Sequence, residues 1–420
     1  MKEISIRAGD PKGISDAELK DILAGALPGG FRRVLLLPPD QTRFHSGGGR
    51  IANIIYHLLK DTCRVDVMPA LGTHAPMDEA QCRRMFGDIP FGCFIAHAWR
   101  TDVVKVGTIP GEFVREASEG LYDAPIDVEV NHRLLEGYDL ILSIGQVVPH
   151  EIAGMANHAK NIFVGCGGPR MIHATHILSA FYGVERVMGR EDTPARRLFD
   201  YAAERFLKDL PIYYLLTVAT APEGETLIHG LFGSAGRASF LNAAALAREK
   251  NISYVDAPLK KVVAYLDEAE FRTTWLGNKA VYRTRMAIRE GGELIVLAPG
   301  IERFGEDEVS DRLIRKYGYC GRDAVLRLCG TQEDLKADLS AAAHLIHGSA
   351  DGHFSITYCT KKLSREAVEG VGYRHMPYMD AAARYDPAHL APGYNRLPDG
   401  EEIFFIPNPA LGLWAVRESI

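Results

Sequence analysis

Short runs of apolar residues alternate with amphipathic segments over the first two-thirds of the chain. The apolar runs at residues 32–39, 63–71 and 138–148 are typical of buried strands. Residues 50–61, 77–87 and 171–183 space their apolar side chains at helical intervals, and residues 160–168 are predicted to form a tight turn. This alternation of strand, loop and helix predicts a mainly parallel sheet with helices on both faces.

A second unit is expected to begin near residue 258. Residues 259–268 are predicted as a strand or a helix, residues 280–292 as a helix that ends at Gly291 and Gly292, and three further segments as strands: 293–299, 354–360 and 402–409. We therefore expect an α/β protein of two domains, each a mainly parallel sheet flanked by helices, with the active site in the cleft between them. The first domain is expected over residues 1–258 and the second over 259–403, with residues 404–420 packing back on the first.

Composition narrows the class of protein. A chain of 420 residues exceeds what one hydrophobic core usually organises, which agrees with two domains. A net charge of -6 gives no electrostatic footprint for nucleic acid or an anionic membrane, so we expect a small-molecule partner. Seven cysteines without a CxxC pair are typical of reduced thiols. Without an apolar targeting segment or a membrane-length apolar window, the sequence predicts a cytoplasmic protein.

Polar and glycine-rich loops follow the three predicted strands of the first domain. Their sequences are PPDQTRFHSGGG (38–49), ALGTHAPM (70–77) and VVPHEIAGMANHAK (147–160). Ligands of open parallel sheets bind outside the carboxyl ends of the strands, so these loops are expected to form one site.

Four residues in these loops are candidates for chemistry. His74 and His150 are suited to act as an acid and a base on opposite sides of one substrate carbon, although each alone is as readily a packing residue. Arg43 is suited to bind a carboxylate or phosphate, the alternative being a surface arginine beside a turn-capping Asp40.

Lysine and histidine further along the chain add a nucleophile and a metal ligand. Lys160 is suited to be a Schiff-base nucleophile, a cofactor anchor or a solvated charge. His173 and His176 share one face of a predicted helix, where one of them would ligate a metal, or would face solvent or a neighbouring element. Because the sequence lacks GxGxxG after its first strand, a Walker motif, HExxH and GxSxG, hydride chemistry would need a carrier other than NAD.

The order and spacing of these elements resemble the lactate racemase family, whose members use a nickel-pincer nucleotide. The elements that carry the resemblance occur in the family's order: Asp40-Gln-Thr-Arg43, Gly72-Thr-His74-Ala-Pro76, Pro149-His150-Glu-Ile-Ala-Gly154, Lys160 and His176. The resemblance extends over most of the chain.

The resemblance implies an isomerase that inverts C2 of a 2-hydroxy acid by hydride transfer through a 2-keto acid. It implies that Lys160 forms a thioamide link to the pyridinium mononucleotide of the cofactor, and that His176 completes the nickel coordination. His74 and His150 would exchange the hydroxyl proton. Arg43, oriented by Asp40, would hold the substrate carboxylate, and Lys279 would contact the substrate. The implied partners are the small-molecule substrate and the cofactor-assembly enzymes.

Departures from the family pattern fall on the expected pocket. The family's SGGxK before the anchor is here Ala156-Asn157-His158-Ala159-Lys160, and DxTRP continues as Phe44-His45-Ser46. Polar groups at His45, Ser46, Asn157 and His158 favour a sugar acid, an aldonate epimerised at C2. Phe44, together with Leu276 where lactate-specific members tend to have glutamine, would instead line a site for lactate or another aliphatic or aromatic hydroxy acid.

The same candidate residues are also compatible with two other classes of protein. A zinc-dependent hydrolase would place the metal on these histidines and leave Lys160 unmodified. A binding protein without catalysis would keep its ligand when His74 or His150 is replaced.

Overall fold

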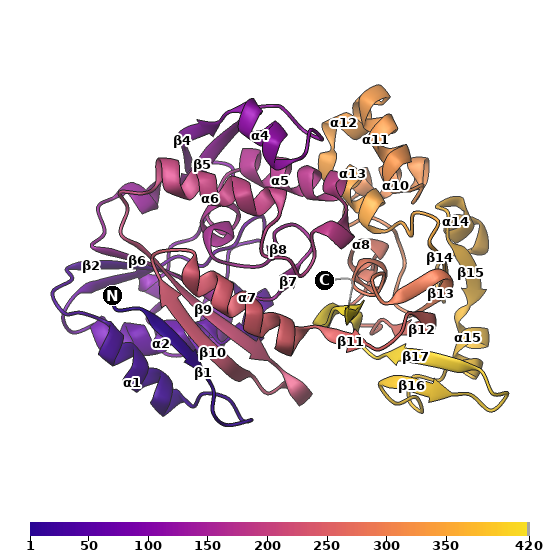
Figure 1. The fold of residues 1–420 in the computed structure, drawn as a ribbon, viewed down its shortest axis with the longest axis horizontal. Helices are drawn as coiled ribbons and strands as arrows, with labels where there is room; N and C mark the ends of the chain where they lie inside the picture. Colours follow the sequence, from indigo (N-terminus) through magenta and orange to yellow (C-terminus); the bar gives the residue numbers. More distant parts are fainter. Residues whose placement is uncertain (418–420) are drawn as a thin grey trace. The chain divides into compact units, whose positions relative to one another are not determined.

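A computed structural model describes residues 1–417 of the chain, which form two compact units (Figure 1). The first unit comprises residues 1–178 and 187–251. The second comprises residues 179–186 and the chain from residue 252 onward. Residues 404–417, whose packing on the first domain stays a prediction, belong to the second unit.

The first unit is built on a six-stranded sheet. Its strands β3, β2, β6 and β9 are parallel, with β3 at one edge, and the other edge is completed by β10 and β1, which pair antiparallel. In sheet order the strands are β1 (Ile4–Arg7), β10 (Leu227–Ser234), β9 (Ile212–Thr220), β6 (Leu140–Gln146), β2 (Arg33–Leu37) and β3 (Arg64–Val67).

Helices cover both faces of this sheet because its strands are apolar on both sides. Val34 and Leu36 of β2 face a cluster with α1, α2 and α3, while Leu35 and Leu37 face a cluster with α5, α6 and α7. The helices are α1 (Asp16–Ala26), α2 (Gly48–Leu59), α3 (Glu79–Phe86), α4 (Gly111–Ala117), α5 (Pro169–Tyr182), α6 (Pro194–Phe206) and α7 (Ala238–Asn251). Figure 1 shows α7 lying along β9 and β10.

Small hairpins and short helices complete the unit. Two two-stranded sheets pair β4 (Val103–Ile109) with β5 (Ile126–Asn131) and β7 (Pro149–His150) with β8 (Gly154–Met155). Within residues 1–417 the 3-10 helices are Gln41–Ser46, Phe91–Cys93, His132–Leu135, Val184–Arg186, Pro222–Gly224 and Pro409–Leu411.

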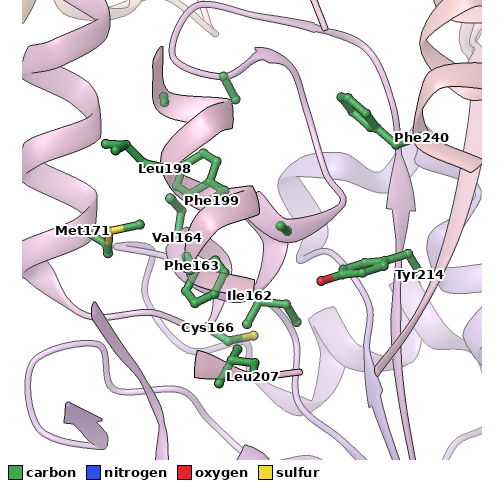
Figure 2. Packing of buried hydrophobic residues seen from close by; sticks show 14 of the residues in the cluster. Ile162, Phe163, Val164, Cys166, Met171, Leu198, Phe199, Leu207, Tyr214 and Phe240 are labelled. Atoms are coloured by element: carbon green, nitrogen blue, oxygen red, sulfur yellow. The ribbon is translucent and has the colours of Figure 1, made fainter. Parts of the chain in front are cut away.

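A π-helix over Asn161–Gly165 replaces the tight turn predicted at residues 160–168. Its three apolar residues Ile162, Phe163 and Val164 are buried, and Figure 2 shows them beside Leu198 and Phe199 of α6. The rings of Phe163 and Phe199 are nearly parallel, with centroids 6.4 Å apart. All five residues of the π-helix are buried, whereas the sequence predicted only a tight turn there.

The second unit has its own six-stranded sheet, parallel except for one edge strand. In sheet order the strands are β15 (Arg374–Pro377), β14 (Phe354–Thr360), β13 (Ile288–Ala298), β12 (Leu259–Tyr265), β17 (Glu402–Ile406) and β16 (Gly393–Arg396). A separate pair joins β11 (Ser253–Val255) to β18 (Trp414–Val416). The helices are α8 (Thr274–Gly277), α9 (Lys279–Tyr282), α10 (Glu308–Tyr317), α11 (Arg322–Thr331), α12 (Glu333–Ala337), α13 (Leu339–His347), α14 (Arg365–Gly370) and α15 (Tyr378–Arg384).

The helix predicted at residues 280–292 is wrong. Only the single turn of α9 is helical, and β13 begins at Ile288, so Gly291 and Gly292 lie inside a strand. Ile288 pairs with Leu259 of β12 and Gly292 with Phe354 of β14, and these long-range pairings override the helical spacing of the apolar side chains.

The fold class predicted from the sequence is confirmed in each unit: a mainly parallel sheet flanked by helices. The location of an active site in a cleft between the domains stays a prediction. Within residues 1–417, no helix combines the length and apolar character that crossing a membrane requires.

Candidate active site

A pocket of about 270 Å³ opens at the carboxyl ends of β2, β3 and β6 in the first unit. Six of the residues predicted from the sequence line it together: Asp40, Arg43, His74, His150, Lys160 and His176. Its other polar lining side chains are Thr42, Ser46, Thr73, Gln146, Glu151, Asn157 and Asn161. Residues of the three strand-end loops therefore line one pocket, and its role as a functional site stays a prediction.

Hydrogen bonds from the π-helix hold the three loops together. The side-chain amide of Asn161 donates to the carbonyl of Leu37 at the end of β2 and to the hydroxyl of Ser143 in β6, both at 3.0 Å. The backbone N–H of Gly72, after β3, donates to the carbonyl of Gly165 at 2.8 Å. The residue after Lys160 thus connects the anchor candidate to the sheet.

Asp40 and His74 form a hydrogen-bonded pair at the pocket. The Nδ1 of His74 lies 2.6 Å from Oδ2 of Asp40, whose other oxygen accepts from the hydroxyl of Thr42 at 2.6 Å. Burial opposes ionisation of Asp40, but the hydrogen bonds from His74 and Thr42 outweigh it and lower the pKa of the carboxyl. An ionised Asp40 fixes the His74 proton on Nδ1 and leaves Nε2 with a lone pair.

This pairing corrects the expected role of Asp40. The sequence assigned Asp40 to orient Arg43, whereas the structure uses both carboxylate oxygens for His74 and Thr42. Among residues 1–417, no carboxylate lies within ion-pair distance of the exposed Arg43 guanidinium. Arg43 is therefore placed to bind an anion from outside the chain.

His150 is held in the opposite tautomer from His74. Its Nδ1 accepts the backbone N–H of Ile152 at 3.0 Å. Burial, with smaller contributions from the positive charges of Lys160 and Arg43, holds the pKa of His150 well below its ordinary value. A neutral ring that accepts at Nδ1 carries its proton on Nε2. The pocket thus holds one imidazole with a free lone pair and one with a free N–H.

Lys160 immediately precedes the π-helix and lines the pocket with its amine. Burial is the main cause that lowers the pKa of Lys160 to about 8, and the nearby Arg43 adds to it. A substantial fraction of the amine is then neutral near pH 8 and able to act as a nucleophile.

His176 presents one free ring nitrogen from α5. Its Nδ1 lies 2.6 Å from the carbonyl of Ile172, which can only accept, so Nδ1 donates and Nε2 keeps its lone pair. Burial lowers the pKa of His176 to about 4. Across residues 1–417, no group of three His, Cys, Asp or Glu side chains is arranged to hold a metal ion.

Three predicted substrate contacts are not among the residues that line the pocket. His45 bonds the hydroxyl of Thr226 through Nδ1 at 2.9 Å. His158 is buried with its ring 3.9 Å from that of Tyr214. Lys279 begins α9 in the second unit, and its substrate contact stays a prediction.

Sequence reasoning missed Glu151, Gln146 and Asn161 as pocket residues. Glu151 lies inside the PHEIAG stretch and Asn161 directly follows Lys160, so their positions next to candidate residues were the available signal. Gln146 ends an apolar strand and carried no such signal.

Together, the fold and the site define a class of protein: an α/β protein with a small-molecule pocket at the carboxyl edge of a parallel sheet. Residues 14–187 match the family model of the lactate racemase N-terminal domain. This part of the chain holds all six predicted residues that line the pocket, and the match supports the resemblance to the lactate racemase family that the sequence motifs carry.

Two solved structures share the fold over nearly the whole chain. One is a protein from Thermotoga maritima, with a TM-score of 0.79 and 23% identity over 98% of this chain and 100% of that one. The other is the lactate racemase apoprotein from Thermoanaerobacterium thermosaccharolyticum, with a TM-score of 0.70 and 17% identity over the same shares of the two chains. No curated protein matches the chain. At these identities the two structures establish the fold alone.

The pKa of Lys160 gives a test of the pocket's electrostatics. Labelling of Lys160 by an amine reagent, followed by peptide mass spectrometry, should have its midpoint near pH 8. Because Arg43 disfavours the protonated amine, Arg43→Met should move the midpoint upward, toward the ordinary lysine value of 10.5. Arg205 is exposed, so Arg205→Met is the matched control and should leave the labelling midpoint of Lys160 unchanged. A midpoint that Arg43→Met does not move would contradict this account.

The Asp40–His74 pair predicts a change of tautomer. Asp40→Asn keeps the size of the side chain but removes the carboxylate, so His74 should lose its fixed Nδ1 proton, seen as a change in its imidazole ¹⁵N shifts. His389 makes an equivalent bond to Asp386 at 2.7 Å and serves as the control. Asp386→Asn should change the shifts of His389 and leave those of His74; unchanged His74 shifts in Asp40→Asn would refute the assigned pair.

Proposed function

We propose that the protein is an isomerase that inverts C2 of a 2-hydroxy acid with a nickel-pincer nucleotide, and that its substrate is a sugar acid. One observation carries the proposal: a nucleophilic amine, a metal-ligating imidazole and two histidines in opposite tautomers line a single pocket. The match of residues 14–187 to the lactate racemase N-terminal domain supports the same chemistry.

The residues present fit the cofactor. Lys160 has a partly neutral amine at the pocket wall, as covalent attachment through a thioamide requires. His176 offers one neutral nitrogen, and soft sulfur donors of the cofactor would complete a nickel site that the chain alone does not build. When bound, the nickel-pincer group supplies an acceptor for the hydride at C2, which leaves a 2-keto acid.

The chain's own groups handle the proton and the carboxylate. The lone pair at Nε2 of His74 is suited to take the hydroxyl proton, and the ionised Asp40 stabilises the imidazolium that results. The N–H at Nε2 of His150 is suited to donate a hydrogen bond to the substrate oxygen. Arg43 would bind the carboxylate, since its guanidinium lines the pocket wall and has no carboxylate of the described residues within ion-pair distance.

Two histidines serve an inversion because the two epimers present their hydroxyls to different walls of the pocket. The group that accepts the proton in one direction returns it in the other. His74 hydrogen-bonds the Asp40 carboxylate at 2.6 Å, whereas the Glu151 carboxylate lies 3.8 Å from Nδ1 of His150, so the two imidazoles differ in how closely a carboxylate supports their positive charge.

The pocket lining favours a sugar acid over an aliphatic or aromatic substrate. Hydroxyl and amide side chains of Thr42, Ser46, Gln146 and Asn157 line it and match the further hydroxyls of an aldonate. The apolar alternative relied on Phe44 and Leu276, neither of which is among the lining residues. The Phe44 ring centroid lies 5.3 Å from the Arg84 guanidinium carbon, and Leu276 belongs to the second unit. Racemisation of lactate or another aliphatic or aromatic hydroxy acid is the alternative within the same chemistry.

The zinc-dependent hydrolase gains no support from the pocket. Hydrolytic zinc sites use three protein ligands with an open fourth position. In the part of the chain that the structure covers, no such group of three occurs, whereas a single histidine is what the pincer cofactor needs.

Inversion at C2 tests the proposed function directly. Protein made together with the cofactor-assembly enzymes should convert an aldonate to its C2 epimer in D₂O without deuterium entering C2, because hydride rather than a solvent proton returns to the carbon. NMR of a panel of aldonates, lactate and longer 2-hydroxy acids measures both product and label. Inversion of lactate alone would select the alternative substrate, and deuterium at C2 would overturn the hydride mechanism.

A further inference from the structure

The loop that leads from His150 to Lys160 contains two consecutive non-glycine residues in the left-handed region. Asn157 has φ 64° and His158 has φ 57°. Left-handed backbone disfavours residues with a Cβ, and the family pattern to which this stretch is similar has glycine at both positions. This chain therefore needs interactions that hold the loop in a conformation its own residues resist.

Side-chain packing supplies part of that support. The side-chain oxygen of Asn157 accepts the backbone N–H of His158 at 2.8 Å, and its amide nitrogen occupies the space where a Cβ on Gly145 would lie, 1.9 Å away. The His158 ring packs against Tyr214 of β9 and Phe240 of α7, with centroids at 3.9 and 5.3 Å. Figure 2 shows these two aromatic side chains beside the buried cluster of the unit.

Arg196 of α6 holds the backbone of the same loop. Its side chain is fully buried, and Nη2 donates to the carbonyl of Met155 at 2.7 Å and to that of Asn157 at 3.1 Å. Met155 belongs to β8, which pairs with β7 and so with His150. One guanidinium therefore fixes the loop on both sides of Ala156, between the two residues assigned to the chemistry.

The arrangement of Arg196 is costly, which argues for a specific purpose. Its Nε and Nη1 are buried without a hydrogen-bond partner in the described part of the chain, and burial lowers the pKa of its guanidinium to about 10. The guanidinium carbon lies 4.3 Å from the ring centroid of Phe240. A buried charge that leaves two nitrogens unsatisfied is a poor device for stability alone, since an apolar side chain of similar volume would avoid the desolvation.

We propose that Arg196 is a positioning residue for Lys160, which acts by holding the carbonyls of Met155 and Asn157 and so keeps the loop in its left-handed course. The role of Lys160 as cofactor anchor rests on the proposed function, while the clamp itself rests on the contacts above. His158 then supports the loop from its far side by aromatic packing and takes no part in substrate binding.

Two measurements on the full-length apoprotein test the clamp. Hydrogen–deuterium exchange of peptides covering residues 154–160 reports the loop, and the pH midpoint of Lys160 labelling reports its amine. In Arg196→Met, exchange should be at least about tenfold faster, and the midpoint should rise by about one pH unit, which leaves roughly fivefold less neutral amine at pH 8. Arg196→Lys keeps the positive charge and one hydrogen-bond donor, so its exchange rate and its labelling midpoint should lie between those of Arg196→Met and the wild type.

Arg205→Met removes an exposed arginine from the same helix and should change neither reading. A folded Arg196→Met protein with wild-type exchange and midpoint would overturn the proposal. If Arg196→Met does not fold, Arg196→Lys decides: exchange at least threefold faster than wild type supports the clamp, and wild-type exchange with a wild-type midpoint refutes it. Neither measurement needs nickel, cofactor or substrate, so an unmodified Lys160 in cofactor-producing cells would refute the proposed function and leave this result standing.

Discussion

Shared burial of basic nitrogens is the constraint on which the site depends. Lys160, His150 and His176 lie in one pocket, and in each the loss of solvation is the main cause that lowers the pKa. An amine that is partly neutral can attack, and an imidazole that is neutral can ligate a metal or donate through a chosen nitrogen. If the same three side chains were exposed to solvent, burial would no longer lower their pKa values.

The loops at the edge of the sheet keep these basic nitrogens buried and hold Lys160 in place. Asn161 ties the residue after Lys160 to β2 and β6, and Gly165 ties the π-helix to the loop after β3. Arg196 and the packing of His158 hold the other end of the anchor loop. Lys160 is thus fixed from both sides along the chain, which is how a long flexible side chain can be aimed into a pocket of modest volume.

Most of the first unit's fold was predictable because its strands and helices have strong apolar periodicity and sit close together in sequence. The six pocket residues were predictable because parallel strands bring their carboxyl ends to one edge. The strand within segment 280–292 was not predictable, since its pairing with Leu259 and Phe354, which are distant in sequence, overrides the helical spacing. The partners of Asp40 and His158 were not either: each depends on a contact between residues far apart in sequence, such as His158 with Tyr214, which local patterns do not encode.

The most direct test of the central claim is the covalent state of Lys160 in protein produced with the cofactor-assembly enzymes. Peptide mass spectrometry with metal analysis should find the cofactor's mass on the peptide that contains Lys160, together with bound nickel. His176→Ala should lose the nickel, whereas the matched variant His173→Ala, at an exposed position three residues earlier on α5, should keep it. An unmodified Lys160, or nickel retained by His176→Ala, would contradict the account.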